Sequence, residues 1–292
     1  MRRKVKNYKF FENYDYYVPG AADVFILLAL LLLGAVIGQL PSLILLVYPN
    51  FDQSAIMLVA YPLMFIPAMI YAGFRSKMRR FDGGGVQLDR CNCYPLGAVL
   101  CTVLVIPATL ALAFACDACS FILPDTPKWF EDAMSLVTEG NVLLNFISVS
   151  IFAPLFEEWL CRGMVLRGLL SHKMKPVWAI VLSALFFAFI HLNPWQALPA
   201  FLFGCLMGYI YYKTGSMKLT MLMHFTNNSF SLLLSNIDAF KDVEKWSDVM
   251  PESTYWLCIA ASLLLLALIV KQFSKISAPS FEEGGSPDIV DA

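Results

Sequence analysis

Long apolar segments restrict the fold of this chain more than any other feature of its sequence. The segments at 22–47 and 54–74 each contain at least the ~20 residues that an α-helix needs to cross a hydrocarbon core of ~30 Å. Hydrophobic residues make up 59% of the 292 residues and charged residues only 15%, with a mean hydropathy of +0.65. Soluble domains are less apolar and more charged. The sequence therefore predicts an all-α, polytopic membrane protein.

The pattern of apolar segments predicts a bundle of about eight transmembrane helices. They are expected at 22–47, 54–74, 95–121, 142–168, 176–193, 195–213, 217–236 and 254–271. Short polar loops separate most of these segments, and the turn at 191–194 is the shortest. The first segment lacks a clear cleavage site after it, so we expect it to remain as a membrane span.

Lysine and arginine residues predict the orientation of the bundle. With the N-terminus in the cytoplasm, 18 of the 21 basic residues fall on the cytoplasmic side or in helix ends that face it. The remaining three, Lys128, Lys241 and Lys245, fall in outside loops that are rich in acidic residues. Both termini are therefore expected in the cytoplasm. The net charge of -1 gives no reason to expect a nucleic-acid partner.

Two adjacent carboxylates, Glu157 and Glu158, lie inside a segment that is otherwise apolar. A charged group in hydrocarbon is costly, and it usually has a partner or a function. Arg162 follows Glu158 by one helical turn, where an ion pair forms in the favourable order. Neighbouring helical residues point about 100° apart, so Glu157 and Glu158 are not expected to share one partner easily. The pair serves either catalysis or a packing network.

Two histidines in later segments supply further polar groups. His191 follows Phe187 by four residues, and His224 precedes Asn227 and Asn228 by three and four, so each set shares a helix face. A carboxylate beside an imidazole can take a proton from water, and an imidazole with an amide can stabilise an oxyanion. Interhelical hydrogen bonding is the simpler alternative. Cys161 is a conceivable nucleophile, but packing is the more common role for such a residue.

These residues resemble three motifs of the CPBP family of intramembrane glutamic endopeptidases, which includes the CAAX prenyl protease 2-like and the bacteriocin-processing, abortive-infection-type proteins. The family pattern is EExxxR, then FxxxH, then HxxxN, on successive membrane helices. Here it falls at Glu157-Glu158 with Arg162, at Phe187 with His191, and at His224 with Asn228. The resemblance covers about residues 140–236. Leu192-Asn193-Pro194 follows His191 where eukaryotic-type members carry a further histidine, so this chain is more similar to the bacterial branch.

The resemblance implies a role for each matched residue. Glu157 would activate the water, assisted by His191, while His224 and Asn228 would hold the oxyanion. Glu158, Arg162 and Phe187 would support them. The family implies no cofactor and no catalytic metal. It implies a peptide or protein substrate, either free or membrane-associated, contact with membrane lipid, and a multi-pass location in a bacterial cell (inner) membrane.

The expected organisation has five parts. A basic cytoplasmic arm at 1–21 precedes the first transmembrane helices at 22–121. The CPBP-like core at 140–236 follows, then a last transmembrane helix at 254–275 and a disordered tail at 276–292.

Helix rise gives a depth for the two histidines. At 1.5 Å per residue, His224 lies roughly 10 Å and His191 roughly 22 Å from the expected cytoplasmic ends of their helices. They meet only if the helix that starts near 176 protrudes from the membrane, and the site is then expected to open toward the cytoplasmic half.

Two alternatives keep the same residues. Glu157, His191 and His224 would serve as zinc ligands of a metal-dependent protease. Otherwise the polar cluster would belong to a non-catalytic scaffold or a bacteriocin-immunity protein.

Overall fold

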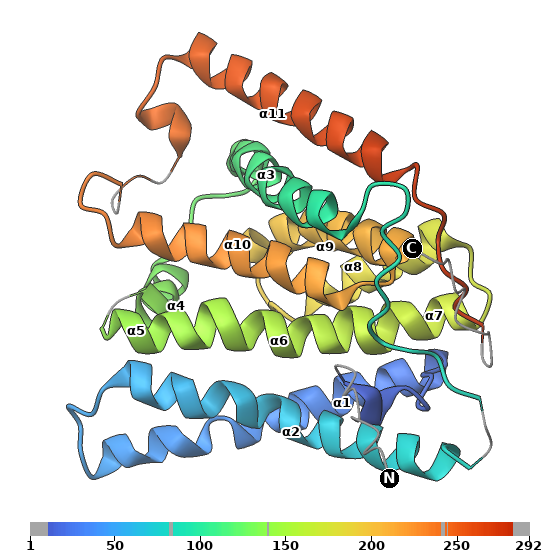
Figure 1. Ribbon diagram of the computed structural model, residues 1–292. Helices are drawn as coiled ribbons and strands as arrows, with labels where there is room; N and C mark the ends of the chain where they lie inside the picture. The colour runs from blue at the N-terminus through green and yellow to red at the C-terminus, as the bar shows by residue number, and fades with distance from the viewer. Residues whose placement is uncertain (1–10, 82–83, 139, 241–242, 244, 283–292) are drawn as a thin grey trace, which may run out of the picture.

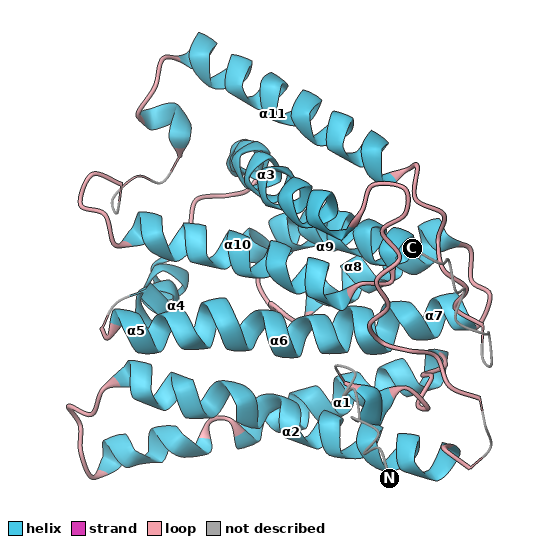
Figure 2. Ribbon diagram, viewed as in Figure 1, coloured by secondary structure: helices cyan, strands magenta, loops and turns pink. Residues whose placement is uncertain are grey.

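A computed structural model describes residues 11–81, 84–138, 140–240, 243 and 245–282, and in these residues it contains helices and no strand (Figure 2). The all-α prediction is confirmed. Within these described residues, five helical segments are long and apolar enough to cross a membrane by length and composition. They are Ala21–Leu46, Gln53–Arg79, Ala98–Phe121, Val142–Ser171 and Glu252–Phe273.

The bundle consists of three layers (Figure 1). The first is a hairpin of α1 (Ala21–Ile37) and α2 (Gln53–Arg79). A Cβ added to Gly34 would lie 1.8 Å from the carbonyl oxygen of Met64, so only glycine permits this close packing. The outer layer on the opposite side contains α3 (Ala98–Cys116) and α11 (Glu252–Phe273), which contact each other.

The middle layer carries the polar residues of the three sequence motifs. Its long helix Val142–Ser171 consists of α5 (Val142–Asn145), α6 (Ala153–Glu158) and α7 (Arg167–Ser171), joined by π-helical segments η4 (Phe146–Phe152) and η5 (Trp159–Leu166). Such wide turns are frequent at functional sites. Here they lie on either side of the two glutamates.

Three further helices complete the middle layer: α8 (Pro176–Phe189), α9 (Pro194–Thr214) and α10 (Met217–Ser235). Helices α8 and α9 form a tight hairpin, since a Cβ on Gly204 would lie 2.8 Å from the Cβ of Ala184. Helix α8 is apolar but short, and α9 and α10 are not among the five long apolar segments. Eight spans therefore remain a prediction.

A short amphipathic helix and several 3₁₀ turns connect these elements. Helix α4 (Lys128–Thr138) lies at one end of the bundle, between α10 and α5 in the view of Figure 1. The 3₁₀ turns are η1 (Glu12–Tyr14), η2 (Leu40–Leu46), η3 (Asp117–Phe121) and η6 (Trp246–Asp248).

Parts of both terminal segments pack against the bundle. Tyr17 and Val18 of the expected arm are buried, while residues 1–10 lie outside the described residues. In the segment where the sequence predicts a disordered tail, Ile276 and Phe281 are buried and the carbonyl of Ser280 accepts a hydrogen bond from Arg90. The burial of these two apolar side chains explains why residues 276–282 pack against the bundle, which differs from the disorder predicted for them. Residues 283–292 lie outside the described residues.

Candidate active site

Glu158 and Arg162 form a buried ion pair at the bottom of the polar cluster. Both side chains are fully buried, and Arg162 Nη1 lies 2.8 Å from Glu158 Oε1. Arg162 Nη2 donates to the carbonyl of Gly204 at 3.1 Å, and its guanidinium lies 4.7 Å from the centre of the Phe187 ring. The ion pair expected from the sequence is present. Its contacts join the long helix to both members of the α8–α9 hairpin.

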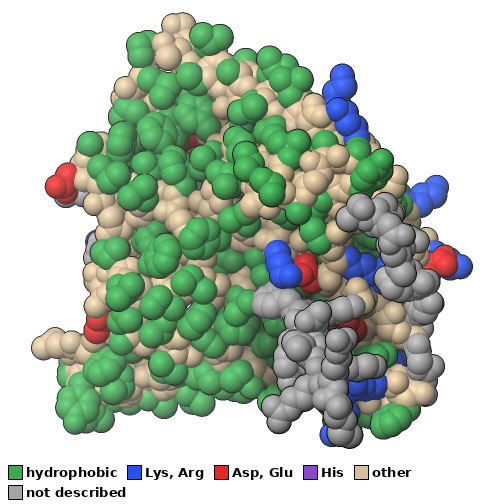
Figure 3. Space-filling model, in the orientation of Figure 1, with side chains coloured by type: hydrophobic (Ala, Val, Ile, Leu, Met, Phe, Trp, Pro, Cys, Tyr) green, Lys and Arg blue, Asp and Glu red, His purple; other side chains and the backbone are tan. Residues whose placement is uncertain are grey.

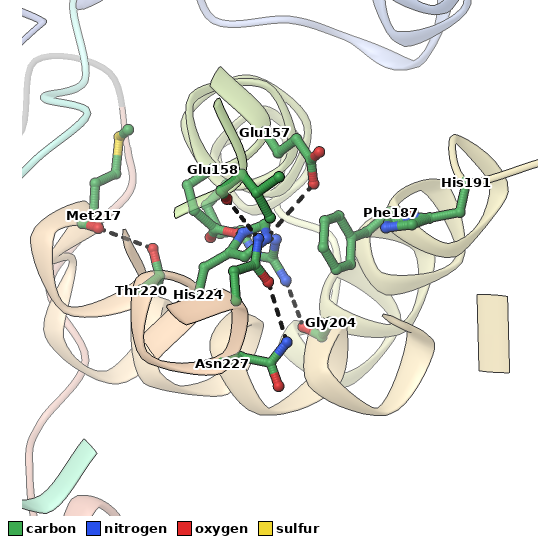
Figure 4. Close-up of polar contacts among 12 residues, drawn as sticks. Glu157, Glu158, Phe187, His191, Gly204, Met217, Thr220, His224 and Asn227 are labelled. Atoms are coloured by element: carbon green, nitrogen blue, oxygen red, sulfur yellow. Dashed lines mark hydrogen bonds and ion pairs between the residues drawn. The ribbon is translucent and has the colours of Figure 1, made fainter. Parts of the chain in front are cut away.

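His224 contacts both glutamates, which differs from the sequence expectation that they would not easily share a partner. Its Nδ1 lies 3.1 Å from Glu158 Oε1, and its Nε2 lies 3.8 Å from Glu157 Oε2. The two ring nitrogens point in different directions, so one imidazole can reach two carboxylates that diverge (Figure 4). His224 is therefore placed between the two acids.

Glu157 is held by a residue that the sequence motifs do not contain. The hydroxyl of Tyr61, on α2, donates a hydrogen bond to Glu157 Oε1. Glu157 Oε2 is buried and has no hydrogen-bond partner among the described residues. A tyrosine inside an apolar segment is a weak signal by itself, and only the packing of α2 against the long helix reveals this contact.

His191 lies on the far side of Phe187 from the glutamates (Figure 4). The Phe187 ring centre is 5.0 Å from the His191 ring and 5.6 Å from the His224 ring. Within the described residues, no hydrogen bond or ion pair joins His191 to Glu157. Its Nδ1 lies 2.8 Å from the Phe187 carbonyl oxygen, which fixes the proton on Nδ1.

Asn228 faces the long helix. Its Nδ2 donates to the carbonyl of Val149 at 2.8 Å, and its Oδ1 accepts from Asn227 Nδ2 at 3.2 Å. Only one of the two N–H groups of Asn228 is used in the Val149 contact. The other N–H group is available to donate to a ligand.

One cavity of about 1110 Å³ connects these groups. Glu157, His191, His224, Asn227 and Asn228 all line it, together with Tyr61 and Phe187. Most of the remaining lining is apolar, as is usual for a ligand pocket. Cys161 is fully buried and is not in the lining, in agreement with a packing role.

The sequence predicts that His191 and His224 meet only if the helix that starts near 176 protrudes from the membrane. The structure shows a different arrangement. Phe187, one turn before His191, is the α8 residue that meets His224. Helix α10 also begins beneath a strap of residues 86–92, where Arg90 N donates to Gly215 O and Asn92 N donates to Thr214 O. Met217 is fully buried there, so α10 does not start flush with the end of the bundle.

The zinc alternative receives no geometric support from the described residues. In them, no three His, Cys, Asp or Glu side chains are grouped as a metal ion requires. Phe187 stands between His191 and His224, which separates two of the three expected ligands.

The fold and the site together define a class: an integral membrane helical bundle with a buried acid–imidazole cluster at the end of a large cavity. Residues 139–230 match the family model described as type II CAAX prenyl endopeptidase Rce1-like, and all three motifs lie within that match. The resemblance drawn from the motifs is thereby confirmed, and this family is one of CAAX protease-type membrane endopeptidases. No curated protein and no solved structure matches the chain.

Proposed function

We propose that this protein is an intramembrane endopeptidase in which Glu157 activates the water that hydrolyses a peptide bond. The observation that carries the proposal is the position of Glu157. Its side chain is 12% exposed, its Oε2 has no hydrogen-bond partner among the described residues, and it lines the cavity beside His224. A carboxylate with one oxygen held by a hydrogen bond and the other without a hydrogen-bond partner is suited to accept a proton.

The contacts of Glu158 support the assignment of this role to Glu157 rather than to Glu158. Glu158 is paired with Arg162 and also contacts His224 Nδ1. Because an ionised carboxylate only accepts hydrogen bonds, His224 carries a proton on Nδ1, and in the neutral ring Nε2 is left with a lone pair. Glu157 and His224 Nε2 then face the same volume and can hold one water between them.

In the proposed reaction, the water oxygen attacks the peptide carbonyl carbon as its proton passes to Glu157. The carbonyl oxygen becomes an oxyanion, which the free N–H of Asn228 is suited to stabilise. The proton then moves from Glu157 to the leaving amine as the C–N bond breaks. His191, whose Nε2 also carries a lone pair when neutral, lies farther along the cavity, where it can bind or orient the substrate.

The substitution Glu157→Gln tests the assignment. It keeps the shape of the side chain but removes the base, so we expect cleavage to fall by about 10²–10⁴-fold, while the midpoint of thermal unfolding stays nearly unchanged. The assay uses the purified full chain with farnesylated and unmodified apolar peptides, and mass spectrometry identifies new peptide termini. The matched control Glu12→Gln changes an exposed carboxylate in η1 that does not line the cavity, and it should leave cleavage intact. Full activity of Glu157→Gln would exclude this residue as the base.

A further inference from the structure

The cavity lies in one half of the bundle only. From α2 its lining includes Met57 and Tyr61, near the start of that helix. From α10 it begins at His224 and continues to Leu234, near the end of the helix. The same holds for α3, which contributes its last residues from Pro107 onward. All these residues lie toward the end of the bundle that contains α4, η3 and η6, and Met134, Asp117 and Trp246 of those elements also line the cavity.

The other end of the bundle is closed by packing. Every residue of the long helix from Glu158 to Leu170 is buried. Arg167 is fully buried, and its guanidinium donates to the carbonyl of Gly163 at 2.7 Å and to the carbonyls of Tyr17 and Val86. The strap at 86–92 lies over this layer, with Leu88 fully buried and its carbonyl bound by Tyr211. No cavity-lining residue comes from this half of the long helix.

The charges identify the two ends. Lysine and arginine residues gather at the closed end, and Figure 3 shows them at one edge of a largely apolar face. They are Arg75, Lys77, Arg79, Arg80, Arg90, Lys173, Lys175, Lys213, Lys218, Lys271 and Lys275. The end that contains the cavity, with α4, η3 and η6, is called the open end. Among the described residues its basic side chains are Lys128 and Lys245, and its acidic side chains are Asp52, Asp117, Asp125, Glu131, Asp132, Asp238, Asp248 and Glu252. Basic loops remain in the cytoplasm, so the closed end is the cytoplasmic one.

We infer that the cavity is entered from the side of the membrane opposite the cytoplasm. The substrate is then an apolar peptide segment that reaches the non-cytoplasmic face, such as an exported peptide or the outer flank of a membrane-anchored one. The statement that the ligand is a substrate rests on the proposed function. The side of entry follows from the cavity and the charges alone. It differs from the sequence expectation of an opening toward the cytoplasmic half.

The surroundings of the opening indicate the chemistry of that segment. The cavity wall is mainly apolar, so it suits apolar side chains of the peptide. The loops around the opening carry more acidic than basic residues, and a negative rim attracts a cationic flank. An apolar segment with a lysine or arginine beside it therefore fits this end of the molecule.

Thiol labelling in cells tests the side of entry without any assay of cleavage. Ser231 is exposed and lines the cavity, so Ser231→Cys reports on it. Cys91 is an exposed native reference at the closed end. Its contact with Cys93 Sγ, at 3.2 Å, lowers the pKa of the Cys91 thiol, which favours its reaction. Cys119 in η3 is the native reference at the open end.

The full chain is expressed in cells that carry it in their surface membrane, and a membrane-impermeant maleimide is added. Mass spectrometry then identifies the labelled cysteines. We expect labelling at Ser231→Cys and Cys119 in intact cells, and at Cys91 only after permeabilisation. Labelling of Ser231→Cys only after permeabilisation, or in neither sample, would overturn the inference. Glu157→Gln should give the same pattern, so a failure of the proposed chemistry is distinguished from a failure of the sidedness.

Membrane vesicles of known orientation extend the test to the substrate. A quenched fluorescent apolar peptide is added to right-side-out and to inverted vesicles, with Glu157→Gln vesicles as the blank. Cleavage above the blank in right-side-out vesicles supports entry from the non-cytoplasmic side. Cleavage in inverted vesicles alone would overturn it while leaving the peptidase function in place.

Discussion

The two halves of the helix Val142–Ser171 have opposite surroundings. From Glu158 to Leu170 every residue is buried, and Arg162 and Arg167 donate to groups on several other elements. From Ser148 to Glu157 the helix contributes to the wall of a large cavity. The first region fixes the positions of the polar groups, and the second leaves one carboxylate available. Substitutions in the packed half should therefore change stability most, and those in the hollow half should change activity most.

Arg162→Met should produce the largest effect on stability and gives the most direct test of this comparison. It leaves the Glu158 carboxylate buried without its cationic partner, which costs about 3–5 kcal/mol in the free energy of unfolding. The measurement is thermal or denaturant unfolding in detergent. The double variant Glu158→Gln, Arg162→Met removes both charges and should be less destabilised than Arg162→Met alone. Equal destabilisation of the two would contradict a charge-based explanation.

Gly204→Ala tests the packing that brings α9 against Arg162. The added Cβ would lie 2.8 Å from the Ala184 Cβ, and such overpacking costs about 1–3 kcal/mol. Combining it with Ala184→Gly should recover part of the lost stability. Gly73→Ala is the matched control, since its Cβ would be 3.6 Å from the nearest atom, on Tyr14. If Gly73→Ala proved as unstable as Gly204→Ala, the close contact would not be the cause.

Tyr61→Phe tests the half of the long helix that lines the cavity, through the contact of Tyr61 with Glu157. It removes the hydroxyl that donates to Glu157 Oε1 and so loosens the orientation of the carboxylate. We expect cleavage to fall by about tenfold, with a stability change of only about 0.5–1.5 kcal/mol. Tyr71→Phe on the same helix is the control, because Tyr71 contacts Arg75 rather than the site. If Tyr61→Phe lost much stability but kept its specific activity, the contact would serve to stabilise the fold and not to orient the carboxylate.

The charge of the peptide flank should have the smallest effect. A peptide with lysine beside its apolar segment should show a KM about threefold lower than the same peptide with glutamate, as expected for exposed charges. Raising the salt concentration should reduce the difference, since exposed charges are screened. The measurement compares KM for the two peptides at low and high salt. A preference for the glutamate peptide would show that the acidic rim does not act on the substrate.

Much of the fold and part of the site could be predicted from local sequence. The apolar segments specify membrane helices because hydrocarbon demands both apolar side chains and internally bonded backbone. The Glu158–Arg162 ion pair follows from i,i+4 spacing, a property of one helix. The three motifs predicted a resemblance to this family, and the match of residues 139–230 to the family model bears that resemblance out.

Other features depend on contacts between segments that are distant in the chain. Tyr61 reaches Glu157 across 96 positions of sequence, and no periodicity within α2 indicates it. The approach of His224 to both glutamates depends on how α10 packs on the long helix, and Phe187 separates His191 from them. The side on which the cavity opens is likewise a property of the whole bundle, because it depends on where packing is incomplete.

The sequence alone determined that this chain is a membrane helical bundle and which polar residues it keeps inside, because the cost of burying charge and the reach of one helical turn are local. Only the tertiary structure decided which of those residues meet and which end of the bundle is hollow, because helices that are distant in sequence pack together through side-chain shape.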